Sequence, residues 1–312
     1  MGSGGAAAGL GLTVETVVSN PSTRPGLDLP GRVILTAGAA EVLVDHVVLG
    51  LVTRVEPATA DEPQVMVEFH RTAVAGTFVL AAGERRVLRF AAPMPWETPV
   101  TVIGGQALLN LRIGLRTEVS VGPSLDRGDL RGLFVHPLPA QERILGALGG
   151  LGFELRQAGL QGGRLPGVRQ TLPIHQKIGF WVGPLYAGPI SELELTFLTD
   201  ADGVDVIFWV NRRLALAGVG HFSISRFRVR HGGVDDVDWA QVLDGWVRHA
   251  IDRHAAAAAA GYGPQPVGHA AAVTGPGFPA TVPSEFRPPD PVTRDGGLTR
   301  NAGGEGESGD DD

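Results

Sequence analysis

The residue types that could bind a metal ion are nine histidines and a short run of aspartates. His249 and His254 are five positions apart, about 140° around a helix axis, so they cannot converge on one ion. We interpret them as a solvated helix end. Asp235-Asp236-x-Asp238 could attract calcium, but it lacks the glycine and the distal glutamate of an EF-hand loop. Capping of a following helix explains these aspartates better, so the sequence predicts no metal site.

Covalent catalysis needs an activated nucleophile, and the sequence offers weak candidates. The chain has no cysteine, which excludes a thiol nucleophile, disulfides and thiolate metal sites. The stretch Gly122-Pro123-Ser124-Leu125-Asp126 lacks the second glycine of a nucleophile elbow, so Ser124 is interpreted as a turn residue. The stretch Gly2-x-Gly4-x-x-Ala7 resembles part of a dinucleotide fingerprint, but it does not join a strand to a helix. We predict no cofactor and no enzyme activity.

Size and charge narrow the class of protein. A chain of 312 residues has room for about two domains. The net charge is −7, and residues 255–312 contain eight acidic residues and three arginines, which is −5 and leaves −2 for the rest. We therefore expect no nucleic-acid partner. No apolar run is long enough for a membrane span, and no signal peptide is evident, so a cytoplasmic protein is expected.

The first part of the chain has the pattern of short strands with turns between them. Residues 1–12 are expected to be a flexible leader, and residues 13–127 an antiparallel β-sandwich. The expected strands are 13–18, 31–36, 41–55, 65–75, 76–80, 85–91 and 109–120.

A proline-rich crossover interrupts this first domain. The segment Pro93-Met94-Pro95-Trp96-Glu97-Thr98-Pro99-Val100-Thr101 cannot be a helix or a central strand. We expect it to be ordered, with Trp96 as its anchor. A ligand for an SH3-type module would look similar, but such ligands usually lie in disordered segments.

Residues 128–152 are expected to be the joint between two domains. Gly128-Asp129-Leu130-Arg131-Gly132 predicts irregular chain, and the prolines that follow Val135 end the first sheet. Pro139 can begin a helix, and Ile144, Leu148 and Leu151 recur at helical spacing. This apolar stripe is expected to be buried between the sheets, although a partner-binding helix would show the same spacing.

Residues 153–254 are expected to form a second β-sandwich with a closing helix. The strands are expected at 153–158, 169–179, 190–200, 204–211 and 223–229. Asp202-Gly203 predicts a tight hairpin between two alternating strands. Trp239 and Trp246 lie on the apolar stripe of the closing helix. Residues 255–312 have the composition of a disordered, acidic tail.

Several short motifs, taken in order, carry a resemblance to a known family. They are Thr13-Val14-Glu15-Thr16-Val17, Arg24-Pro25-Gly26 followed by Gly31-Arg32-Val33, Pro95-Trp96-Glu97-Thr98-Pro99-Val100-Thr101, His136-Pro137-Leu138-Pro139, Leu148-x-x-Leu151-Gly152-Phe153, Gln170-Thr171-Leu172-Pro173, Glu192-Leu193-Glu194-Leu195 with Asp202-Gly203-Val204, and Asp238-Trp239. In this order, over about residues 13–254, the chain resembles the bacterial sporulation-control proteins of the SpoOM family.

The resemblance implies an arrestin-like fold, with two β-sandwiches in tandem, and a cytosolic regulatory or adaptor protein without known catalytic residues. Members of the family look like platforms for protein interactions. The chain departs from the family in its Gly/Ala leader, where members often carry a basic amphipathic segment, and in its acidic tail.

Our leading hypothesis is a non-enzymatic, arrestin-like adaptor whose partners are other proteins. One rival is a small-ligand or metal binder, possibly an enzyme, whose pocket is assembled from distant residues such as His136, His175 and His221. Another rival is a self-assembling protein that polymerises through unpaired strand edges. The structural or interface residues expected from the sequence are Pro25, Gly26, Trp96, Pro99, Pro137, Ile144, Leu148, Asp202, Gly203, Trp239 and Trp246.

Overall fold

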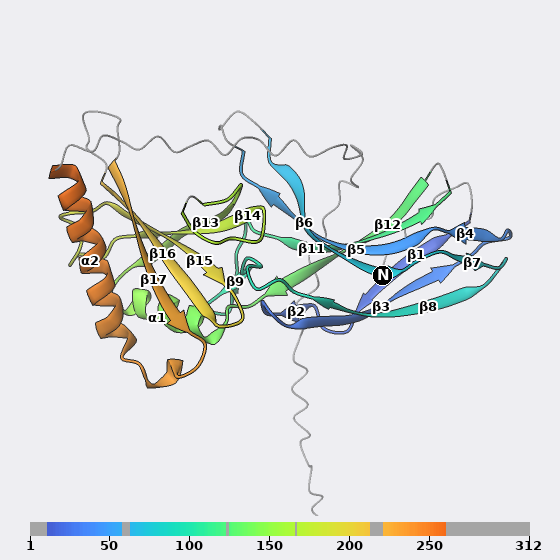
Figure 1. Cartoon of the computed structure of the whole chain (residues 1–312), viewed down its shortest axis with the longest axis horizontal. Coiled ribbons are helices and arrows are strands. Elements are labelled where there is room, and N and C mark those ends of the chain that lie inside the picture. The colour runs from blue at the N-terminus through green and yellow to red at the C-terminus, as the bar shows by residue number, and fades with distance from the viewer. Residues whose placement is uncertain (1–10, 58–62, 123–124, 166, 213–220, 260–312) are drawn as a thin grey trace, which may run out of the picture.

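The structure is a computed structural model that describes residues 11–57, 63–122, 125–165, 167–212 and 221–259. These residues form an elongated body in which two β-rich parts follow each other along the long axis, and the long C-terminal helix lies at one end (Figure 1). The leader expected at 1–12 falls almost wholly outside the described residues, as do Ser124 and most of the acidic tail.

The N-terminal part packs two β-sheets around one apolar core, and their strands are antiparallel except for the short parallel pair β2-β12. The smaller sheet has the order β1-β3-β8 and the larger one β2-β12-β11-β5-β6, with short ladders β4-β7 and β9-β10 beside them. The element bounds are β1 Thr13–Val18, β2 Ser22–Thr23, β3 Asp28–Thr36, β4 Val42–Val44, β5 His46–Val55, β6 Val65–Ala75, β7 Phe78–Leu80, β8 Arg85–Pro93, β9 Val102–Ile103, β10 Gln106–Ala107, β11 Ile113–Val121 and β12 Leu125–Val135.

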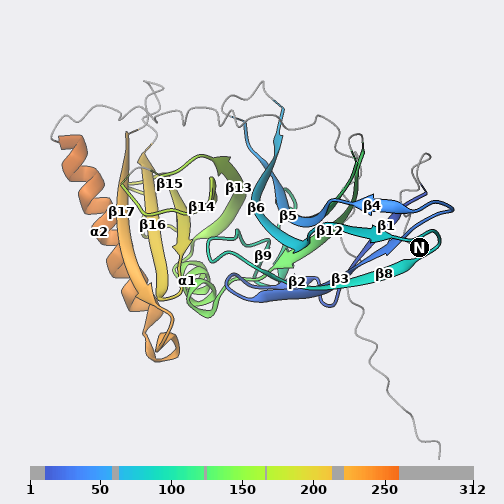
Figure 2. The same ribbon diagram turned by 45° about the vertical axis from the view of Figure 1, so that its right-hand side comes forward.

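The C-terminal part is one five-stranded antiparallel sheet with helices on one face. Its strands follow chain order: β13 Glu154–Gly162, β14 Ile174–Trp181, β15 Glu192–Thr199, β16 Gly203–Arg212 and β17 His221–Arg230. Helix α1 (Pro139–Gly150), the short 3-10 helix η1 (Val234–Asp236) and helix α2 (Trp239–Ala259) complete this part. Figures 1 and 2 both show α2 running beside β17.

An aromatic cluster fixes α2 on the sheet. The Trp246 ring stacks on Phe227 of β17 at a centroid distance of 4.5 Å and meets Phe208 of β16 edge-on at 6.4 Å. Trp239 meets Trp246 edge-on and donates its indole N–H to the Val234 carbonyl at 2.7 Å. Such pairs contribute about 0.5–1.5 kcal/mol each beyond the area that they bury.

The prediction of a mainly β, arrestin-like chain with helices at the joint and after the last strand is confirmed. One detail differs from the expected sandwich: in the described residues, helices α1 and α2 supply the layer opposite the C-terminal sheet. The alternating apolar face of β15 and β16 needs a cover, and the apolar stripes of the two helices provide it.

The expectation of irregular chain from Gly128 to Gly132 is wrong. This stretch lies inside β12, which pairs with β11 in continuous register from Val121↔Leu125 to Ile113↔Leu133. A Cβ at position 128 would lie 2.7 Å from the Thr117 carbonyl oxygen, so the glycine permits close approach of the two backbones. The side chain of Asp129 accepts the Thr16 backbone N–H at 2.7 Å and so covers the edge of β1.

The predicted hairpin is confirmed. Strands β15 and β16 pair from Glu192↔Asn211 to Thr199↔Val204, and Asp200 to Gly203 form the connection. Gly203 serves the packing of the strands, because a Cβ there would lie 2.1 Å from the Val229 carbonyl oxygen of β17.

Several expected boundaries shift. Asp45 divides the expected strand 41–55 into β4 and β5, β11 begins at Ile113 instead of 109, and β14 begins only at Ile174 because residues 169–173 belong to a loop. Helix α2 continues to Ala259, past the expected end at 254.

His254 is buried, so the interpretation of a solvated helix end is wrong for this residue, whereas His249 is exposed. Asp238 caps α2 by accepting the Gln241 backbone N–H at 3.1 Å, as expected.

Candidate functional site

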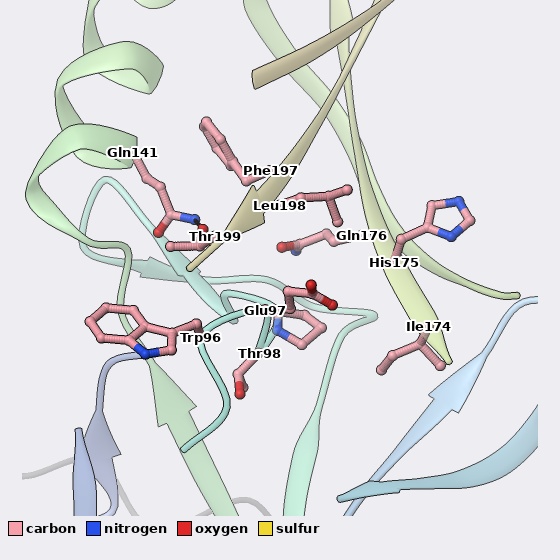
Figure 3. A pocket seen from close by; sticks show the side chains of 11 residues that line it. Trp96, Glu97, Thr98, Gln141, Ile174, His175, Gln176, Phe197, Leu198 and Thr199 are labelled. Carbon is pink, nitrogen blue, oxygen red and sulfur yellow. Dashed lines mark hydrogen bonds between the residues drawn. The ribbon is translucent and has the colours of Figure 1, made fainter. Parts of the chain in front are cut away.

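The crossover between β8 and β9 is the segment that joins the two parts of the molecule. Residues 95–101 follow β8 of the N-terminal part, and Trp96, Glu97 and Thr98 lie beside β14 and β15 of the C-terminal sheet (Figure 3). The segment is a stiff turn, because both the backbone N–H and the hydroxyl of Thr98 donate to the Pro95 carbonyl at 3.0 and 2.6 Å. Its far end is held by Thr101, which donates its N–H to Val135 O and accepts Val135 N–H at its hydroxyl. Pro99, in the middle, is buried.

Trp96 bridges the two parts by lying between a glycine and a histidine. Gly26 has φ +77°, and a Cβ there would lie 2.5 Å from the Trp96 ring, so only glycine lets the indole lie this close. On the C-terminal part, the ring stacks on His231 at 5.4 Å with an interplanar angle of 26°. The His231 N–H donates to the Asp202 carbonyl at 3.3 Å, which links Trp96 to the β15-β16 hairpin.

Glu97 and Gln176 fasten the crossover to the C-terminal part by bonds from side chain to backbone. The Glu97 carboxylate accepts the backbone N–H groups of Thr171 and Leu172 at 2.8 to 2.9 Å. The Gln176 amide accepts Val100 N–H at 3.0 Å and donates to Val100 O at 2.8 Å. Bonds of this kind satisfy backbone groups that would otherwise be buried without a partner.

A second seam joins the end of β5 to β13. Glu56 donates its backbone N–H to the Leu160 carbonyl at 2.7 Å. Leu160, Leu172 and Ile174 of the C-terminal part belong to the N-terminal core, and Val100 of the N-terminal part belongs to the C-terminal core. The two cores therefore exchange side chains across the joint.

Helix α1 is part of this joint, and its apolar stripe is core. Ile144 and Leu148 have no exposed surface and pack into the C-terminal core, so the stripe is not open to a partner. The Gln141 amide oxygen accepts the Leu138 N–H at 2.8 Å, and the Gln141 amide nitrogen lies 3.4 Å from the Thr199 hydroxyl. Pro137, which precedes the helix, is buried.

A small cavity lies between the crossover, α1 and β14. It has a volume of about 10 Å³ and is lined by Trp96, Glu97, Thr98, Pro99, Gln141, Ile174, His175, Gln176, Phe197, Leu198 and Thr199 (Figure 3). That is room for about one water molecule, whereas small-molecule sites occupy hundreds of Å³. The cavity is a packing gap in the joint and does not have the size of a substrate pocket.

His175 is the buried titratable group at this cavity. Its Nδ1 lies 3.3 Å from the Gly163 carbonyl, and its Nε2 has no hydrogen-bond partner. Burial lowers the pKa of His175, with a smaller opposing effect from the Gly163 carbonyl. The imidazole is therefore neutral at pH 7.

The three histidines of the rival pocket are not gathered at this cavity. His175 lines it, but His136 does not; His136 follows β12, and burial, helped by Arg24, lowers its pKa. His221 begins β17, and its side chain lies outside the described residues. Among the residues that the structure describes, no group of three His, Asp or Glu side chains could hold a metal ion.

The structure brings some of the expected interface residues together and separates others. Gly26, Trp96 and Asp202 line one continuous contact through His231, and Pro99 lies next along the same segment. Trp239 and Trp246 lie in the α2 cluster, where they pack in the C-terminal core.

Sequence reasoning missed the glutamines of the joint. Gln170 lies in the loop before β14; its amide oxygen accepts Leu165 N–H, and its amide nitrogen donates to the carbonyls of Gly163, Leu172 and Ile174. Gln176 lies between two buried isoleucines on the same side of β14. Gln176 could have been recognised from the sequence, because it is a polar residue at a position where the alternation of Ile174 and Ile178 predicts an inward-facing apolar side chain.

In the described part of the chain, none of the helices combines the length and the apolar character that crossing a bilayer would require.

Comparison with known proteins gives three matches that agree. The family model described as SpoOM protein matches residues 3–214. The sporulation-control protein spo0M of Bacillus subtilis (strain 168) is 30% identical over 211 residues, which are 67% of this chain and 79% of the relative. The crystal structure of Spo0M from Bacillus subtilis superposes with a TM-score of 0.66 at 26% identity, covering 79% of this chain and 99% of that one.

Proposed function

This chain belongs to the SpoOM family of sporulation-control proteins, and from that membership we propose that it is a regulatory adaptor that acts by binding other proteins and not by catalysis. The proposal places this binding in the cytoplasm, as the family resemblance implies. The joint supports an adaptor, because it fastens the two β-rich parts to each other while its cavity has room for about one water molecule.

The observation that carries the proposal is the edge of β17. This strand ends the C-terminal sheet and pairs with β16 over ten residues, from Gly203↔Arg230 to Arg212↔His221, without a register shift. Helix α2 packs on this strand through the Phe227 ring, a side chain on the face of the sheet. A strand that ends a sheet in unbroken register is a template on which an extended segment of another protein can add a strand.

The other long edges are less available. Strand β6 shows two register shifts against β5, and β13 shows one against β14. The β1 edge is covered by Asp129, and β8 lies against β6. Bulges and covered edges are the usual means by which proteins prevent strand addition. We therefore infer that β17 is the strand that a partner would extend.

Alternation along the strand identifies which groups a partner would meet. The His231 N–H points toward β16, because it donates to the Asp202 carbonyl. In an antiparallel ladder the backbone groups alternate between the two sides, so Arg226, Arg228 and Arg230 direct their N–H and C=O groups away from β16. These three residues would form the new ladder.

A proline in place of Arg228 tests the proposal. Arg228→Pro removes one outward N–H, and Arg228→Ala is the matched control that loses the same guanidinium but keeps the N–H. The tagged chain, carrying a photo-crosslinking amino acid at Arg230, is expressed in its native host in growing and in starved cells, and crosslinked proteins are identified by mass spectrometry. We expect a reproducible partner with the wild type and with Arg228→Ala, and its loss with Arg228→Pro. Equal crosslinking of both variants, or no partner in either growth state, would contradict the proposal.

A further inference from the structure

The outer face of the small N-terminal sheet carries three arginines that form no ion pair. The side chains that point outward from β1, β3 and β8 form what we call the arginine face: Thr13, Glu15, Val17, Asp28, Pro30, Arg32, Ile34, Thr36, Arg85, Val87, Arg89, Ala91 and Pro93. Arg32, Arg85 and Arg89 are exposed. Within the described residues no salt bridge joins any of them, whereas the neighbouring Arg86 pairs with Glu84 at 2.7 Å.

Two of these arginines face each other across the sheet. Arg32 of β3 and Arg89 of β8 are direct partners in the antiparallel register. Like charges directly opposite each other destabilise a sheet. The strand on the other side places Val17 next to Arg32, so it offers no carboxylate there. Glu15, two positions along β1, and Asp28, which pairs with Pro93 at the start of β3, are the acidic members of the face, and neither lies directly opposite an arginine. An anion lying across Arg32 and Arg89 would remove the repulsion.

The apolar members of the face define the shape of what fits. Val87 is 42% exposed and lies beside Ile34, so a short apolar row separates Arg85 from the Arg32 and Arg89 pair. Ile34 is only 6% exposed, so Val87 forms most of the exposed apolar surface, with charges at both ends of this row. An extended, acidic peptide without bulky side chains matches that layout. A second copy of the face would bring arginine against arginine and does not match.

The chain contains such a peptide at its own C-terminal end. Residues 301–312, Asn-Ala-Gly-Gly-Glu-Gly-Glu-Ser-Gly-Asp-Asp-Asp, carry five carboxylates, no basic residue and four glycines. We propose that this acidic segment docks on the arginine face of the same molecule, with its carboxylates on Arg32, Arg89 and Arg85.

The covalent connection permits this contact. Helix α2 and the arginine face lie at opposite ends of the long axis (Figure 1). From Ala259 to Glu305 the chain has 46 residues, which can span up to roughly 150 Å when extended. Although this body is elongated, that span is several times the radius of gyration of about 18 Å that a compact body of this size would have. The connection is therefore long enough, and tethering raises the local concentration of the segment.

Spin-label distances in the full-length chain test the proposal. The chain has no cysteine, so two introduced cysteines carry all of the label. The test protein is Thr13→Cys with Ser308→Cys, which places one nitroxide on the arginine face and one in the acidic segment. The matched control is Ala73→Cys with Ser308→Cys, which moves the first label to an exposed position on the other sheet. Pulsed electron paramagnetic resonance then gives the distance distribution of each pair.

We expect a short-distance population for the Thr13 pair and a broad, long distribution for the Ala73 pair. The short population should be lost in 1 M NaCl, in Arg32→Gln/Arg89→Gln, and when the five carboxylates of the segment are changed to amides. The last variant leaves the folded body untouched, so it keeps the test valid if the arginine variant unfolds. The same broad distribution for both pairs would overturn the proposal. So would a short population that disappears on tenfold dilution with unlabelled protein, since the contact would then be between molecules.

Discussion

The side-chain amide of Gln176 holds both polar backbone groups of Val100, a residue 76 positions earlier in the chain. Both residues are buried. This pairing makes Gln176 a fastener whose loss can be measured.

Gln176→Leu is expected to lower the free energy of unfolding by about 1–3 kcal/mol, because it leaves Val100 N–H and C=O buried without partners. Urea denaturation at pH 7, followed by circular dichroism, measures the change. Gln161→Leu, a partly exposed residue on β13, is the control and should change stability by less than about 0.5 kcal/mol. Equal effects of the two substitutions would show that the pairing adds nothing.

Gly26→Ala is expected to displace Trp96. The substitution forces an alanine into φ +77° and drives its Cβ into the indole. Gly83→Ala is a matched control, since Gly83 has φ +70° and no atom within 4 Å of an added Cβ. The free energy of unfolding of the control should fall only by the cost of placing an alanine in a left-handed backbone conformation, about 1–2 kcal/mol.

We expect the free energy of unfolding of Gly26→Ala to fall by about 1–3 kcal/mol more than that of the control, because the added methyl group overpacks the site. We also expect the tryptophan fluorescence of the folded protein to change. Denaturation and emission spectra of both variants provide the comparison. A Gly26→Ala protein that matches Gly83→Ala in both measurements would mean that Trp96 does not depend on the glycine.

Leu148→Ala should lower the free energy of unfolding by about 2–5 kcal/mol, because it truncates a side chain that has no exposed surface and packs between α1 and the C-terminal core. Leu109→Ala removes the same atoms from a position that is 85% exposed and should cost almost nothing. Thermal or urea unfolding separates the two. A small effect at Leu148 would argue that the stripe of α1 is not core and is free for a partner.

Stability should fall as the pH falls from 7.5 to 5.5. Burial lowers the pKa of His175, His70 and His136 below the ordinary value of 6.5. Below pH 6.5 the unfolded chain therefore binds protons that the folded chain does not, and the contribution is lost as the pH drops toward the folded pKa values. The urea midpoint should be lower at pH 5.5 than at pH 7.5.

His175→Gln isolates the contribution of the most buried of these three histidines. The variant should lose less stability over the same pH interval than the wild type, because one histidine with a lowered pKa is gone. Burial raises the pKa of Glu56, which acts in the opposite direction, but this carboxyl is common to both proteins. Parallel pH profiles for the two proteins would contradict a buried, neutral His175.

The parts of the fold that the sequence predicted are those set by local pattern. The β15-β16 hairpin followed from alternation on both sides of Asp202-Gly203, and α1 followed from the spacing of Ile144 and Leu148. Each signal lies within about twenty residues, where the period of the strand or helix is directly visible.

The parts that were mispredicted or missed depend on contacts that are distant in the sequence. Gly128 was interpreted as a break, but it fits in β12 because Thr117 of the neighbouring strand approaches closely. The bond of Gln176 to Val100 and that of Glu97 to Thr171 join a side chain to a backbone more than 70 residues away. Every residue type has the same backbone carbonyl, and all but proline have a backbone N–H, so the sequence does not reveal which backbone groups these side chains bind.

The exchange of side chains between the two cores limits how this chain can be recombined. Leu160, Leu172 and Ile174 complete the N-terminal core, and Val100 completes the C-terminal one, so neither half carries its whole interior. A chimera cut at the sequence boundary near Val135 would inherit a crossover from one parent and its fasteners from the other. For laboratory shuffling, and for gene fusion in evolution, the exchangeable unit is therefore the two β-rich parts together.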